Sequence, residues 1–169
     1  ETSSLASAQI VLSTDYANLN YRWMHAILAS NFRSRAKGDN GTVKFVGTGG
    51  STSATIQTST INGTSAQLDS YVDGTSIGST TMNAFTVTSH TKTTIGKNTF
   101  NGGGPFIGNV YEVIAIDQEI NLTQRILIEN YLSAKYGISI ANDKFSEQGT
   151  HPNDVAGIGQ TSSTDNHSD

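Results

Sequence analysis

Three carboxylates at the end of an apolar run are the residues best placed for acid-base chemistry. They are Glu112, Asp117 and Glu119. A retaining glycoside hydrolase needs two carboxyl groups about 5–5.5 Å apart. Glu112 and Asp117 are five positions apart, which places them on opposite faces of a regular strand. The spacing therefore predicts a strand end and a solvated turn, and a hydrolase with an altered motif is the second alternative function.

Other catalytic patterns are missing from the sequence. The chain has no cysteine, which excludes a thiolate metal site and a cysteine nucleophile. Its four histidines, at positions 25, 90, 151 and 167, are too far apart for a metal-ligand spacing. The glycines at 102–104 precede an apolar run that is typical of a strand, whereas a phosphate site needs a helix behind the loop. We therefore predict that the chain is not an enzyme.

Calcium is the ion that the acidic and amide side chains would favour, because it accepts six to eight oxygen ligands on loops. The candidate ligands are Asp39, Asn40, Asp69 and Asp73. They do not follow the spacing of an EF-hand loop, so ordinary turn and strand roles remain the alternative.

Two further groups are candidates for ligand binding. Tyr21 and Trp23 could offer an aromatic plate to a sugar, although Trp23 also suits a core. Arg33 and Arg35 belong to a small basic cluster that could contact an anionic glycan or another subunit, or form a solvated strand face or loop. The later tyrosines are expected in core and helix packing; they are Tyr111, Tyr131 and Tyr136.

Composition narrows the fold and the partners. Serine and threonine account for 42 of the 169 residues, and only 14% of residues are charged. Threonine-rich chains suit half-buried sheets better than helical bundles. The net charge of −4 predicts no nucleic-acid partner, and no apolar run approaches the roughly 20 residues of a membrane span.

Short alternating runs separated by turns predict many strands and one late helix. Asp73-Gly74 lies between two such runs and predicts a type I′ hairpin turn. A helix is predicted from a cap at Asn121 or Thr123 to Gly137, docked by Leu127, Ile128, Tyr131 and Leu132. The predicted strands cover 8–13, 21–28 (with a helix as rival), 42–46, 53–61, 67–72, 75–77, 84–89, 93–95 and 106–116, the last as the most apolar and central strand.

Three segments resemble the concanavalin A-like lectin/glucanase superfamily, in its laminin-G-like and pentraxin-like group. Residues 68–75 (LDSYVDGT) are similar to its hairpin, and residues 106–114 (FIGNVYEVI) are similar to a following strand. Residues 122–138, ending in YLSAKYGI, resemble the C-terminal helix of bacterial members. The resemblance covers mainly residues 66–140, and the Trp-rich opening that is usual in the family is missing from residues 1–20.

The resemblance implies an all-β, jelly-roll β-sandwich over residues 1–140 with one C-terminal amphipathic helix, its N-terminal part divergent or incomplete. Residues 141–169 are expected to be a polar tail or the start of a following module. The implied function is a non-catalytic recognition or adhesion module that binds carbohydrate, extracellular and part of a larger bacterial surface protein. The first alternative is a structural module that assembles with another chain.

The apolar run at 106–116 also predicts association. A strand this apolar cannot face water on both sides without exposing a sticky patch and an open edge. If early strands are missing from the sandwich, we expect self-association or packing against another chain or segment. The contact would involve sheet edges or the face that carries Val110, Glu112, Ile114 and Ile116.

Overall fold

The computed structural model describes residues 9–16, 19–28, 30–37, 43–62, 64–83, 92–98 and 104–144. For residues 15–16 and 19–22 only the backbone is described. No helix within these ranges is long and apolar enough to cross a membrane.

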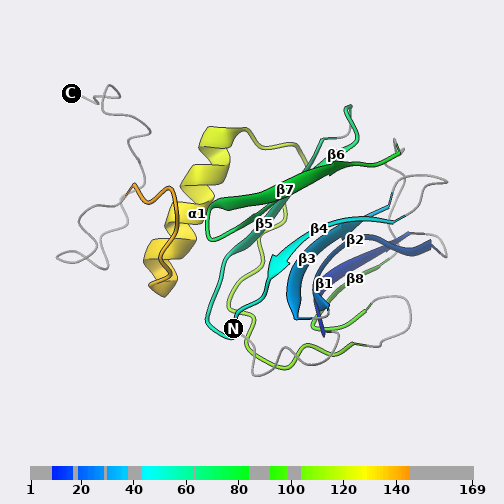
Figure 1. The fold of residues 1–169 in the computed structure, drawn as a ribbon, viewed down its shortest axis with the longest axis horizontal. Helices are drawn as coiled ribbons and strands as arrows, with labels where there is room; N and C mark the ends of the chain where they lie inside the picture. Colours follow the sequence, from blue (N-terminus) through cyan, green and yellow to red (C-terminus); the bar gives the residue numbers. More distant parts are fainter. Residues whose placement is uncertain are drawn as a thin grey trace.

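The strands form two antiparallel sheets that lie face to face, with the single helix beside the smaller one (Figure 1). The larger sheet has the order β4-β3-β2-β1-β8, and the smaller one has the order β5-β6-β7. The larger sheet consists of β1 (Gln9–Tyr16), β2 (Leu19–Leu28), β3 (Asn31–Ala36), β4 (Lys44–Gly49) and β8 (Lys92–Ile95). The smaller sheet consists of β5 (Gln57–Asn62), β6 (Gln67–Val72) and β7 (Thr75–Thr81), and α1 spans Leu122–Tyr136.

The two sheets bury a common core. Its members come from both sheets and from the turns beside them; they are Ala36, Val46, Ala66, Leu68 and Met82, with Ile61 and Ile77 packed against them. A second apolar cluster lies on the other face of the larger sheet and contains Ile10, Met24 and Ala26. Successive side chains of a strand point to opposite faces, so Met24 and Ala26 of β2 lie on one face of the larger sheet and Ala36 of β3 and Val46 of β4 on the other. The predicted all-β sandwich with a C-terminal helix is confirmed.

The predicted hairpin between β6 and β7 is confirmed. Asp73 has φ 49° and Gly74 has φ 74°, the left-handed values that a type I′ turn requires at both central positions. A side chain at Gly74 would also lie 3.3 Å from the backbone nitrogen of Ala141. Asp73 accepts a hydrogen bond from the Ile56 backbone N–H at 2.7 Å through Oδ1, so the turn holds the chain that leads into β5.

The helix begins and ends as predicted. Asn121 accepts a hydrogen bond from the Gln124 backbone N–H, while the Gln124 side chain accepts from the Asn121 N–H, which completes a capping box. Gly137 ends α1 with φ 64°. Its left-handed conformation is one that glycine adopts without steric cost.

The predicted docking face of α1 is wrong in part. Leu127 and Tyr131 are exposed and Ile128 and Leu132 are half-buried, whereas the buried positions are Arg125, Ile126, Glu129, Asn130 and Ser133. Polar side chains can occupy this face because each has a partner. Arg125 donates to Glu129, Asn130 bonds to the backbone of Asn142 and Lys144, and Ser133 donates to the Ile138 carbonyl.

The predicted central strand over 106–116 is also wrong. Apart from a single bridge at Gly108 the segment has no strand pairing, and its side chains from Ile107 to Ile116 are exposed. Its beginning is fixed to the larger sheet by the Ile107 N–H, which donates to Gln9 Oε1 at 2.9 Å. Its alternating apolar pattern is that of a strand, but such a pattern does not determine whether the backbone pairs with a neighbouring strand.

The remaining strand predictions divide into confirmed and untested ones. The strands at 8–13, 42–46, 53–61, 67–72, 75–77 and 93–95 match described strands within a few residues, and the strand reading of 21–28 is confirmed over the helical one. The predicted strand at 84–89 lies outside the described residues. Sequence analysis predicts no separate strand at β3, where Phe32, Ser34 and Ala36 are buried between half-buried arginines.

Candidate functional site

An open, mainly apolar cleft of about 560 Å³ lies between the two sheets. The inner face of the larger sheet forms its floor, with Leu12, Trp23, His25, Ile27 and Phe32. The chain before and along β5 forms one wall, residues 109–120 form another, and Ile128, Leu132 and Tyr136 of α1 contribute to the lining. A concave, largely apolar site with a few polar groups is the usual form of a small-ligand site.

A chain of polar contacts connects the floor to the β5 wall. Trp23 donates through Nε1 to Ser59 Oγ at 2.9 Å, and Ser59 Oγ lies 3.1 Å from His25 Nε2. The indole can only donate, so Ser59 Oγ accepts from Trp23, and the hydroxyl keeps a proton and a second lone pair for its contact with His25 Nε2. The other ring nitrogen, Nδ1, lies within hydrogen-bond distance of Ser34 Oγ, at 3.3 Å.

His25 is neutral at neutral pH. Burial lowers its pKa from 6.5 to about 4, while a hydrogen bond with Gln57 acts in the opposite direction. The Trp23 ring contacts the His25 ring edge-on, with centroids 4.9 Å apart, and fixes its orientation. The floor of the cleft therefore presents neutral aromatic surface rather than a cation.

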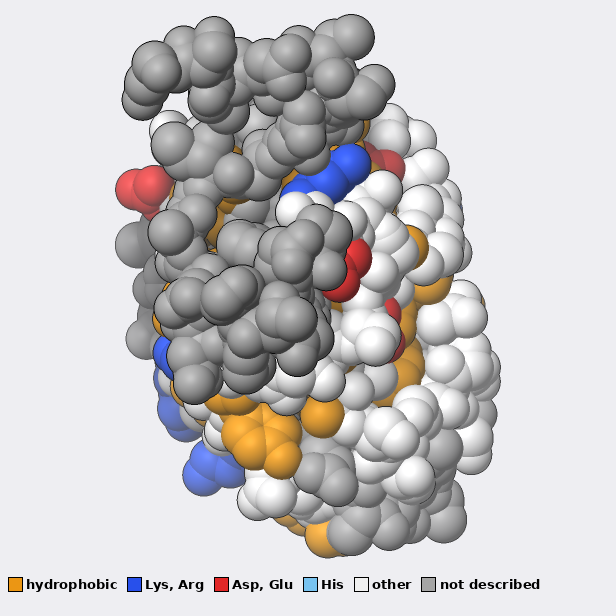
Figure 2. Space-filling model, turned by 90° about the vertical axis from the view of Figure 1, so that its left-hand side faces the viewer, with side chains coloured by type: hydrophobic (Ala, Val, Ile, Leu, Met, Phe, Trp, Pro, Cys, Tyr) orange, Lys and Arg blue, Asp and Glu red, His pale blue; other side chains and the backbone are white. Residues whose placement is uncertain are grey.

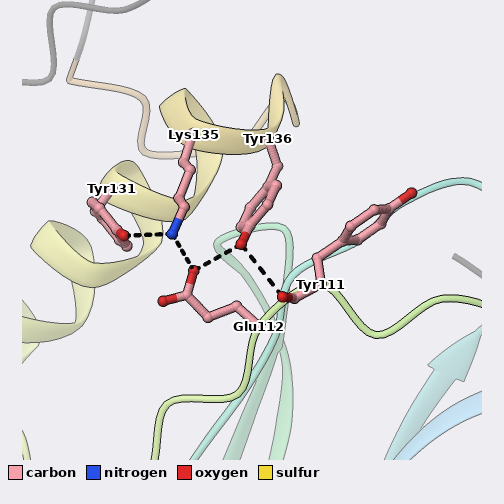
Figure 3. A network of polar contacts seen from close by, with 5 residues as sticks. All are labelled: Tyr111, Glu112, Tyr131, Lys135 and Tyr136. Carbon is pink, nitrogen blue, oxygen red and sulfur yellow. Dashed lines mark hydrogen bonds and ion pairs between the residues drawn. The ribbon is translucent and has the colours of Figure 1, made fainter.

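The mouth of the cleft carries a group of tyrosines around one carboxylate (Figure 3). Glu112 Oε2 accepts from Lys135 Nζ at 3.1 Å and from the Tyr136 hydroxyl at 2.9 Å. These two hydrogen bonds, the one from Lys135 above all, lower the pKa of Glu112. Contacts with the Tyr131 hydroxyl and with Glu112 raise the pKa of Lys135. Glu112 and Lys135 are therefore both charged and form an ion pair with each other.

Tyr111 is the most exposed aromatic residue of this group. Half of its surface is accessible, and its ring lies 5.4 Å from that of Tyr136 at an interplanar angle of 35°. The Tyr136 hydroxyl is also 3.5 Å from the Tyr111 carbonyl oxygen. The prediction that Tyr111 and Tyr131 belong to the core is wrong, because both side chains face solvent.

Two further carboxylates lie along the same wall. Both oxygens of Glu119 accept from the Asn62 amide, at 2.8 and 2.7 Å, which attaches this end of the segment to β5. Asp117 is exposed beside it and also lines the cleft. In the absence of a regular strand, Glu112 and Asp117 do not occupy the strand faces that sequence analysis assigned to them.

The predicted sugar-binding residues do not form one site. Trp23 lines the cleft, and the side chain of Tyr21 lies outside the described residues. Arg33 pairs in register with Ala26 and Arg35 with Met24, so both arginines point away from the cleft. Arg33 lies over the Phe45 ring at 4.7 Å and passes close to Gly47, where a Cβ would be 2.9 Å from Arg33 Cγ.

The predicted calcium ligands are tested only in part. Asp39 and Asn40 lie outside the described residues. Asp69 accepts from Gln67 Nε2 at 2.7 Å, and Asp73 accepts from the Ile56 N–H. Burial raises the pKa of Asp73, and the Ile56 hydrogen bond partly offsets this effect. Within the described ranges no group of three histidine or acidic side chains could hold a metal ion, and calcium binding stays a prediction.

Sequence reasoning missed Ser59, Tyr111 and Tyr136 as cleft residues. Ser59 is one of many serines and threonines in its segment and has no local signal. Tyr111 and Tyr136 are 25 positions apart, and their contact follows only from the path of the segment against α1. The carboxylate Glu112 was recognised from sequence, but as a rejected catalytic group rather than as the centre of a tyrosine cluster.

Solved structures share the fold of this chain at low sequence identity. The CBM40 carbohydrate-binding module of the Ruminococcus gnavus IT-sialidase, bound to alpha2,3-sialyllactose, is similar with a TM-score of 0.50 and 15% identity, over 64% of this chain and 66% of that chain. The match thus spans just under two thirds of that chain's length. The same module bound to alpha2,6-sialyllactose gives a TM-score of 0.49 and 16% identity, over 63% of this chain and 67% of that chain. No family model and no curated protein matches the chain.

Proposed function

We propose that the chain is a non-catalytic carbohydrate-binding module and that the cleft is its binding site. The observation that carries this proposal is the half-exposed Tyr111 ring beside Tyr136 and Glu112 at the mouth of an apolar cleft. The apolar faces of sugar rings pack on aromatic side chains, and carboxylates accept hydrogen bonds from their hydroxyl groups.

The preorganisation of the site supports the proposal. Tyr136 is held by Glu112, and Glu112 is held by Lys135, so these groups need little ordering when a ligand binds. Glu112 Oε1 has no donor among the described residues and remains able to accept from a ligand hydroxyl. The Trp23–Ser59–His25 contacts hold the floor of the cleft against the β5 wall.

A glycan array probed with the labelled chain, with and without calcium, tests the proposal. We expect binding to at least one oligosaccharide, and Tyr111→Ala to weaken it by at least about fivefold, since one stacked ring contributes roughly 1–3 kcal/mol. Phe45→Ala is the matched control, because Phe45 is a half-exposed aromatic residue outside the cleft lining. Silence across a broad array in both conditions would falsify the proposal.

We further propose that the module belongs to the concanavalin A-like superfamily and acts outside the cell, as part of a larger bacterial surface protein. The hairpin at Asp73-Gly74 and the helix ending at Gly137 support the first part, because both occupy the places that the family resemblance implies. Calcium remains a candidate ligand of this module through Asp39, Asn40, Asp69 and Asp73.

An assembly module is the second candidate function. The observation that favours it is the run of exposed apolar side chains along the unpaired segment, which includes Ile107, Val110, Val113, Ile114 and Ile116. Hydrophobic side chains also reach the surface on the side of the molecule that α1 occupies (Figure 2). Glycoside hydrolysis is the remaining alternative: turnover of a β-glucan that disappears in Glu112→Gln would support it over both binding functions.

A further inference from the structure

The charged side chains that line the cleft all have the same sign. They are Glu112, Asp117 and Glu119, and no lysine or arginine is among the described lining residues. All three carboxylates lie on the wall formed by residues 109–120, and all are exposed at its surface. An occupant of the cleft would therefore approach a wall whose charged lining side chains are all acidic.

Lys135 forms an ion pair with Glu112 and offsets that charge, whereas Asp117 and Glu119 have no ion-pair partner among the described residues. Lys135 Nζ already donates to Glu112 Oε2 and to the Tyr131 hydroxyl, so two of its three donors are used. The imidazole of His25 on the floor is buried and bonded to two serine hydroxyls. The guanidinium groups of Arg33 and Arg35 point away from the cleft, on the other face of the larger sheet.

The hydrogen-bonding capacity of this wall is that of an acceptor. Glu112 Oε1 and the Asp117 carboxylate have no donor among the described residues, and both line the cleft. Carboxylates without a donor can bind neutral hydroxyl groups in pairs, whereas an anionic group offers them no proton. Like charges close together also repel, and the repulsion grows as water is excluded.

We propose that the cleft selects uncharged oligosaccharides and excludes acidic ones, such as sialylated, sulfated or uronic-acid glycans. This inference rests on the proposed carbohydrate-binding function and concerns the same site. Tyr111 and Tyr136 supply the stacking surface, and Glu112 and Asp117 accept hydrogen bonds from sugar hydroxyls. Glu119 stays bonded to Asn62 and contributes its charge to the exclusion.

Matched pairs of glycans test the selection directly. The probe is an array on which each neutral oligosaccharide is printed beside the counterpart that carries one added sialic acid, sulfate or uronic acid. We expect the acidic member of a bound pair to bind at least about tenfold more weakly, the size expected for one added charge near several like charges at a protein surface. Binding should be read at low and at high salt, because screening reduces the difference.

Two charge variants locate the effect. Asp117→Asn with Glu119→Gln removes two negative charges and keeps the side-chain sizes, so the neutral-to-acidic ratio should fall to near one. Arg33→Ala with Arg35→Ala is the control, and the ratio in the cleft should not change. Acidic glycans could lose binding in the arginine variant while neutral glycans still bind. That result would assign the acidic glycans to the outer face of the larger sheet and support their exclusion from the cleft.

The inference and the proposed function fail in different ways. The selection is overturned if acidic glycans bind the wild-type chain as tightly as their neutral counterparts and still do so without Arg33 and Arg35. Carbohydrate binding itself would remain supported. A ratio that does not change in the Asp117→Asn, Glu119→Gln variant also overturns the selection. Absence of binding to every glycan overturns the proposed function itself.

Discussion

The Nε2 atom of His25 lies 3.1 Å from the hydroxyl oxygen of Ser59, and this contact joins β2 of the larger sheet to β5 of the smaller one. The two sheets meet elsewhere through apolar packing, so a polar bridge at this point belongs to the cleft. The imidazole in this bridge is neutral at neutral pH, because its burial disfavours the charged form and lowers its pKa.

The stability of the chain should therefore decrease in mild acid. The folded pKa of His25 is about 4, below its ordinary value of 6.5, so the unfolded chain binds more protons between these two values. The contribution of His25 to stability is fully present above pH 6.5 and is lost as the pH drops toward 4. Between pH 7.5 and 5.0 we expect a loss of about 2 kcal/mol in the free energy of unfolding.

Urea unfolding at the two pH values measures this loss. His25→Gln removes the titrating group and should flatten the pH dependence, while Ser34→Ala keeps the imidazole and should retain most of it. An equal pH dependence in wild type and His25→Gln would assign the effect to other groups.

The turn between β6 and β7 should tolerate asparagine and reject alanine at position 73. Asp73→Ala removes the acceptor of the Ile56 N–H. It also places alanine, which seldom adopts the left-handed conformation, at φ 49°. We expect a loss of about 1–3 kcal/mol in the free energy of unfolding. Asp73→Asn keeps an acceptor and tolerates this φ, so it should cost much less. Equal losses in the two variants would contradict the assigned role of the side chain.

Local signals account for the parts of the fold that could be predicted. The turn at Asp73-Gly74 and the helix ends at Asn121 and Gly137 depend on the chemistry of a few adjacent residues, and the structure confirms each. The strand at 106–116 fails for the opposite reason, since pairing needs a free edge elsewhere in the chain.

The helix face shows the same limit at the level of side chains. The hydrophobic pattern predicts that Leu127 and Tyr131 are buried. In the structure the buried side chains include Arg125 and Glu129, whose charges neutralise each other. The cleft could not be predicted from the sequence either, since Ser59 and Tyr111 contact residues that are distant in sequence.

The ion pair inside α1 should be sensitive to the loss of one partner. Arg125 Nη1 lies 2.6 Å from Glu129 Oε2, both side chains are buried, and the guanidinium covers the Tyr71 ring at 3.8 Å. Arg125→Met leaves the Glu129 charge buried without compensation and should lower the free energy of unfolding by about 3–5 kcal/mol. Adding Glu129→Leu should recover much of that loss, because a buried pair can be replaced by apolar groups of similar size.

The exposed ion pair between Lys135 of α1 and Glu112 of the preceding segment provides the control. Glu112→Gln breaks the contact with Lys135 at the surface and should leave the urea midpoint unchanged. A single Arg125→Met variant as stable as wild type would show that Glu129 finds another partner or takes up a proton.

Self-association should follow from the exposed segment if the chain is an assembly module. Val110 and Ile114 are 36% and 41% exposed and have no strand partner among the described residues, so a second chain could cover them. Sedimentation at micromolar concentration should then show a dimer or larger species. Ile114→Lys should shift it to monomer, because a buried lysine without a partner opposes the contact. Phe45 is also exposed but lies outside the segment, so Phe45→Lys should leave the sedimentation unchanged. A wild-type chain that stays monomeric at these concentrations would leave carbohydrate binding as the function of this surface.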